Sequence, residues 1–168
     1  MVSPHPLLIA AHGRLPSTDL ANTAAKYLVQ MTDNAIAQKG CSTSATLTVT
    51  NAADASSLAS CQTYSGSIAI ATGATEISIP VTRVTENFVT VPDGQLTSLS
   101  APSLRQVDGR LTIQSQANLA TVSMPSLIEA DTFTLQALGP NLLTLDFGTP
   151  GLQQVSQLTV QDLSLIHI

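Results

Sequence analysis

The chain has 168 residues, of which 10 % are charged and 3 % aromatic, it contains no tryptophan, and its formal net charge is −5 at pH 7. This length suits one domain of ordinary size. The scarcity of large rings argues against an aromatic core and favours stacked rows of small aliphatic side chains. Because no lysine follows Lys39, the basic surface that nucleic acid requires is missing, and nucleic-acid binding is excluded.

Residues 1–40 differ in kind from the rest of the chain. The apolar run at residues 7–11 has no Lys or Arg before it, so it lacks the form of a secretory signal. From Ser17 to Gly40, apolar residues recur at helical spacing, with Ser17 as an N-cap and Gly40 as a stop. We predict an N-terminal extension of residues 1–40 with one accessory amphipathic helix, whose polar face lacks the basic residues of a membrane-surface helix.

The segment from Cys41 to Cys61 is predicted to cap the array that follows. Residues 46–50 alternate as a half-buried strand does, and residues 51–61 predict a short helix. A helix across the end of a solenoid covers its open edge and apolar cross-section. The only two cysteines flank this unit. A disulfide between them would close a loop of about 20 residues and contribute roughly 3 kcal/mol, and two buried thiols are the alternative.

One short pattern then repeats from Leu96 to Val160. Its copies begin at Leu96, Leu119 and Leu142, which are evenly spaced, and a fixed period of roughly 20 to 29 residues is typical of leucine-rich or β-type solenoids. The first two copies share a Ser-x-Pro-Ser-Leu corner, at residues 100–104 and 123–127. Proline costs no ladder hydrogen bond at such a corner. The third copy matches this pattern less closely.

Alternating apolar residues in these copies predict two parallel sheets that enclose one core. The predicted fold is mainly β, a right-handed parallel β-solenoid over residues 41–162 with a short N-terminal capping helix. The predicted core residues are Ile68, Ile70, Ile77, Ile79, Leu96, Leu99, Leu104, Val107, Leu111, Ile113, Leu119, Val122, Leu127, Phe133, Leu135, Leu142, Leu145, Leu152, Val155, Leu158 and Val160.

These features resemble a known family. The cysteine-flanked cap, the sequence Tyr64-Ser-Gly-Ser-Ile-Ala-Ile70 and the Ser-x-Pro-Ser-Leu corners are similar to the receptor L-domain type of leucine-rich β-solenoid. More narrowly, they resemble fungal GPI-anchored cell-wall organisation proteins, over residues 41–162. The resemblance implies that Cys41 and Cys61 pair, and that the protein is a secreted, non-catalytic glycoprotein of the cell wall or plasma-membrane surface. Its implied partners are wall polysaccharide or wall proteins.

The chain also departs from that family. Members begin with a signal peptide and end with a Ser/Thr-rich stalk and a hydrophobic anchor signal, which this sequence does not show. It also has no Asn-x-Ser/Thr glycosylation site. We therefore expect a fragment or a mis-assembled gene model, in which residues 1–40 replace the native start and residues 163–168 are a foreign tail. The strand near residues 158–160 would then be an open edge.

The sequence offers little for catalysis. It lacks the common nucleophile, phosphate-binding and metal-binding motifs, so we expect no catalytic, cofactor or metal site. Asp108 and Asp131 occupy equivalent positions in successive copies of the repeat. Turn-forming aspartates are the preferred interpretation, and a carboxylate ladder for calcium or a glycan is the alternative.

Two other functions stay open. A polysaccharide-acting β-helix enzyme would need clustered carboxylates, usually with a Lys, Arg or His on one coil face. A ligand-binding receptor ectodomain is the other, although no apolar segment of about 20 residues supplies a membrane span.

Overall fold

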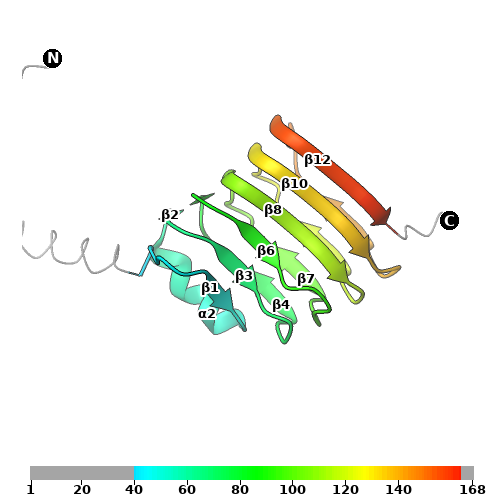
Figure 1. The fold of residues 1–168 in the computed structure, drawn as a ribbon, viewed down its shortest axis with the longest axis horizontal. Helices are drawn as coiled ribbons and strands as arrows, with labels where there is room; N and C mark the ends of the chain where they lie inside the picture. Colours follow the sequence, from blue (N-terminus) through cyan, green and yellow to red (C-terminus); the bar gives the residue numbers. More distant parts are fainter. Residues whose placement is uncertain (1–39, 164–168) are drawn as a thin grey trace, which may run out of the picture. The chain divides into compact units, whose positions relative to one another are not determined.

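Two parallel sheets form the part of the chain that the computed structural model describes, residues 40–163 (Figure 1). Residues 164–168 lie outside the described residues, and so does the predicted accessory helix except for Gly40. The large sheet contains, in spatial order, β1 (Leu47–Val49), β3 (Ile68–Ile70), β6 (Phe88–Thr90), β8 (Gln106–Gln116), β10 (Glu129–Leu138) and β12 (Gln154–Leu163), with β2 (Thr63–Tyr64) paired to β5 (Arg83–Val84) and β5 to β8. The small sheet contains β4 (Glu76–Ser78), β7 (Ser98–Ser100), β9 (Thr121–Ser123) and β11 (Thr144–Asp146).

The pairing confirms a mainly β, parallel β-solenoid. Phe88 pairs with Leu111, Leu111 with Phe133, and Phe133 with Leu158, so each coil places its apolar residue directly over that of the coil before. Ser100 pairs with Ser123 in the small sheet, and both strands therefore end at equivalent corners. Leu163, which the sequence assigns to the tail, instead continues β12 opposite Leu138.

The cap is a short helix that takes the place of a strand. Helix α2 (Ala52–Ser56) is followed by the 3₁₀ turn η1 (Ser57–Ser60) and packs against β4 and β1. The side-chain oxygen of Asn51 accepts hydrogen bonds from the backbone N–H groups of Ala53 and Asp54 at 2.8 and 3.1 Å. These bonds satisfy donors that the first turn of a helix leaves unpaired.

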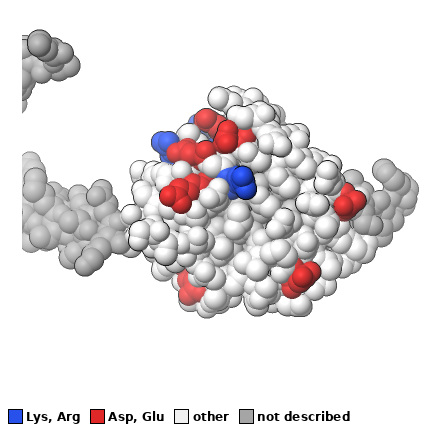
Figure 2. All heavy atoms as spheres, viewed as in Figure 1, with Lys and Arg blue, Asp and Glu red and all other residues white. Residues whose placement is uncertain are grey.

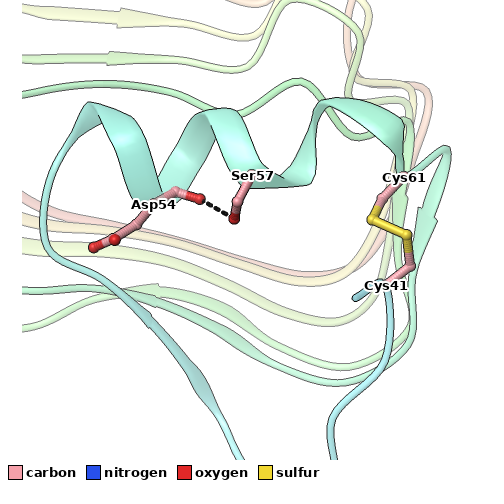
Figure 3. Close-up of a disulfide and its surroundings, with 4 residues drawn as sticks. All are labelled: Cys41, Asp54, Ser57 and Cys61. Atoms are coloured by element: carbon pink, nitrogen blue, oxygen red, sulfur yellow. Dashed lines mark hydrogen bonds between the residues drawn. A yellow bond between two sulfur atoms is a disulfide. The ribbon is translucent and has the colours of Figure 1, made fainter. Parts of the chain in front are cut away.

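A disulfide joins Cys41 to Cys61 just beyond this helix, across 20 residues of sequence (Figure 3). Both half-cystines are buried. The bond therefore fastens the start of the first coil to the point where the chain leaves the cap. Ala55 and Leu58 point from the cap into the apolar interior and are also buried.

The interior between the sheets holds most of the predicted core residues. Those that are buried are Ile68, Ile70, Ile77, Ile79, Leu96, Leu99, Leu104, Val107, Leu111, Ile113, Leu119, Val122, Leu127, Phe133, Leu135 and Leu142. Leu152 and Val155 are only partly buried and pack against this core.

The last coil departs from the prediction. Leu145, Leu158 and Val160 occupy inward positions, yet they are 41 %, 56 % and 50 % exposed. The reason is their place in the array: β11 and β12 pair on one side only among the described residues. A core position in a solenoid is buried only when coils lie on both sides of it.

Gly66 occupies a backbone conformation that a larger residue would strain. Its φ is +133°, and an added Cβ would lie 2.7 Å from the carbonyl oxygen of Thr43. We expect Gly66→Ala to lower the free energy of unfolding by about 2 kcal/mol. Gly73→Ala is the matched control, because nothing lies within 4 Å of its added Cβ, and its effect should stay within about 1 kcal/mol. Urea denaturation measures both, and equal losses would contradict the strain at Gly66.

Candidate functional site on the outer face of the large sheet

The outer face of the large sheet repeats the same two polar residues on three successive strands. β8, β10 and β12 each contain Thr-x-Gln, in which the middle residue points inward and the other two outward. The outward residues are Thr112 and Gln114, Thr134 and Gln136, and Thr159 and Gln161. The parallel register pairs threonine with threonine and glutamine with glutamine across all three strands. Each row therefore crosses the strands with a step of about 4.8 Å.

Short side chains lie between longer ones on this face and leave a groove of about 560 Å³. Its floor includes Thr112 and Thr134 and continues to Val89, which pairs with Thr112. Arg110 lies on the side where the strands begin, and Gln114 lies on the side where they end. The groove thus follows from the difference in length between neighbouring outward rows, and it runs across the strands. We call it the threonine groove.

Most of the charged side chains on this face gather where β8, β10 and β12 begin, and one basic group lies nearer the middle of the face (Figure 2). Arg83 donates from Nη2 to Asp108 Oδ2 at 2.6 Å and from Nε to both carboxylate oxygens at 3.1 Å. This hydrogen bonding and the charge of Asp108 raise the pKa of Arg83, with a smaller contribution from Glu129. A second hollow, of about 290 Å³, is lined by Arg83 and Asp108 together with Glu129 and Asp131.

The two aspartates that the sequence assigns to turns lie inside strands instead. Asp108 belongs to β8 and Asp131 to β10, at a point where the register shifts between Ala130 and Thr132. The sequence Asp-Gly favours a turn, but a β-bulge also accommodates an extra residue without ending the strand. Both oxygens of Asp108 accept from Arg83. Within residues 40–163, no three His, Cys, Asp or Glu side chains are placed to hold a metal ion.

The threonine groove is not among the sites that the sequence predicts. A signal is nevertheless present, because the Thr-x-Gln that begins at Thr112 recurs at Thr134 and again at Thr159. These two intervals are unequal, unlike the even spacing of Leu96 and the leucines that follow it. The rows become visible only once the inward residues are aligned.

Comparison with known proteins finds one relative of this chain among those that match. The described residues form a β-solenoid with a disulfide-closed cap, and none of their helices is long and apolar enough to cross a membrane. The chain is similar to the cell wall protein ecm33 of Schizosaccharomyces pombe, with 31 % identity over 113 residues. The match covers 64 % of the chain and 26 % of ecm33, so the chain spans about a quarter of the length of this relative. No family model and no solved structure matches the chain. The relationship is a distant homology to a fungal cell wall protein.

Proposed function

We propose that this chain is a non-catalytic module of a fungal cell-surface protein, and that it contributes to cell-wall organisation by contacting wall components through the faces of its solenoid. The similarity to ecm33 carries the proposal. The fold supports it, because stacked coils give extended and regular surfaces on which a polymer or another protein can lie. The disulfide between Cys41 and Cys61 fits the oxidising conditions outside the cell.

The ion pair between Arg83 and Asp108 supports a structural role for Asp108. An enzyme acting on polysaccharide would use a pair of carboxyl groups that flank the scissile bond. Here both oxygens of Asp108 are engaged by Arg83, and this pairing favours a structural role that ties β5 to β8.

The finer assignments rest on the family resemblance. We assign the wall-contacting role to the receptor L-domain-like solenoid of residues 41–163, which includes Leu163. We also propose that the intact protein is glycosylated and held at the plasma membrane or wall by a GPI anchor.

Retention in the wall tests the proposal. The full chain, carrying a secretion leader and an epitope tag, is expressed in S. pombe, and the tagged protein is measured in washed walls and in the medium. We expect most of it in the wall fraction, because the solenoid itself makes the contacts. The control is an unrelated secreted protein of similar size and charge with one disulfide. Recovery of both proteins mainly in the medium would contradict a wall-contacting role.

A further inference from the structure

We propose that the threonine groove binds a neutral glucan chain, which lies across the strands of the large sheet along the stacking direction of the coils. This inference rests on the proposed function, since it names the wall component that the solenoid contacts and the surface that contacts it.

The chemistry of the groove matches a polymer of hydroxyl groups. Threonine hydroxyls and glutamine amides each offer both a donor and an acceptor, as sugar hydroxyls do. Thr112, Thr134 and Gln114 line the groove and present these groups. Val89 and Pro92 line it too, and their apolar surface can pack against the C–H groups of a sugar ring.

The charge pattern selects an uncharged polymer. Arg110 is the one charged residue that lines the groove, and the acidic side chains seen on this face lie away from its middle (Figure 2). Glu129 and Asp131 line the neighbouring hollow and would repel a polyanion whose length extends past the groove. An anionic polymer would therefore meet one favourable charge, Arg110, and repulsion from the adjacent carboxylates. A neutral polymer has no charged groups of its own to dehydrate on binding.

The direction of the groove favours a polymer over a short sugar. The equivalent groups recur on neighbouring coils at the strand spacing of about 4.8 Å, so a long chain can make the same contact several times. Among the described residues, no aromatic side chain that could stack on single sugars lines the groove: Tyr64, Phe88 and Phe133 are buried, and Phe147 packs partly buried against the core and against Phe133. Binding therefore depends on many weak contacts that act together, and it should strengthen with chain length.

Binding of the purified full chain to insoluble β-1,3-glucan tests the inference. The first variant is Thr112→Val with Thr134→Val, which removes two hydroxyls from the groove and keeps side-chain shape. The matched control is Thr121→Val with Thr144→Val, because these threonines pair on adjacent strands of the small sheet. We expect the groove variant to bind about tenfold more weakly, because it loses two neutral hydrogen bonds to the glucan. The control should bind like the wild type. Circular dichroism and thermal melting establish that both variants are folded.

Three outcomes overturn the inference. Equal binding by the wild type and the groove variant would remove the groove from the contact surface. No binding of the wild type to glucan, with retention in the wall still observed, would leave the wall role intact and point to a protein partner or to chitin. Stronger binding to the polyanion polygalacturonate than to glucan would contradict the charge argument. If the wild type neither bound glucan nor was retained in the wall, the proposed function itself would be contradicted.

Discussion

Leu111→Asp is expected to abolish cooperative folding. Leu111 is fully buried between Phe88 and Phe133 in the central coils, and the substitution would leave a carboxylate there without a partner. The expected loss exceeds about 5 kcal/mol, which is comparable with the whole stability of many domains, about 5–15 kcal/mol. Circular dichroism during urea denaturation measures the loss, and we expect no cooperative transition.

The same substitution at Leu158 provides the control. Leu158 belongs to the same inward row, two strands further along, but it is 56 % exposed. A carboxylate there stays hydrated, so Leu158→Asp should cost about 1 kcal/mol or less. A wild-type transition in the Leu111→Asp protein would show that the inward and outward faces of β8 are exchanged.

Removing the disulfide is expected to have the second largest effect. The double substitution Cys41→Ala and Cys61→Ala should lower the free energy of unfolding by about 3 kcal/mol, because the bond closes a loop with a separation of 20 residues. The released segment contains α2, so the helical cap should loosen first. Urea denaturation of the wild type and the double variant measures the difference.

A reductant separates the effect of the disulfide from that of the changed side chains. We expect reduction to lower the stability of the wild type and to leave the double variant unchanged. A wild type that unfolds at the same urea concentration with and without reductant would mean that the bond adds nothing to the stability of the cap.

The register of the coils could be predicted from the sequence because burial enforces it. A shift of one residue would turn Leu111 and Ile113 to solvent, so the apolar spacing aligns Leu111 with Phe133. The spacing leaves the register at Phe88 open by one residue, and the pairing of β6 with β8 places Phe88 opposite Leu111. The expected open edge near residues 158–160 agrees with the single pairing of β12 among the described residues, but the exposure of its inward side chains does not follow from the apolar spacing. Leu158 and Val160 match the core pattern, but burial depends on a coil on each side, and a local pattern does not report it.

The threonine groove illustrates a second limit. Sequence shows that Thr112 and Thr134 point outward, but the depth of a groove depends on side chains from different coils. Arg110 and Gln114 are longer than the residues between them, and their positions relative to Val89 follow from the pairing of β6 with β8.

The bulge near Asp108 is a similar case. Leu111 and Phe133 are closer together in the sequence than Val107 and Ala130, although both pairs are opposite each other in the sheet. The two spacings differ because the bulge adds one residue to β8 that has no partner in β10. It could not be interpreted from the sequence, because Asp-Gly also fits a turn.

The unequal protection of the two sides of the array has a consequence for how it opens. On one side the disulfide and α2 hold the first coil, whereas among the described residues β12 pairs with β10 alone. In a stack whose units touch only their neighbours, a unit with one neighbour opens at a lower free energy than a unit between two. Amide hydrogens in β12 should therefore exchange with solvent before those in β8, and local unfolding should advance coil by coil toward the cap.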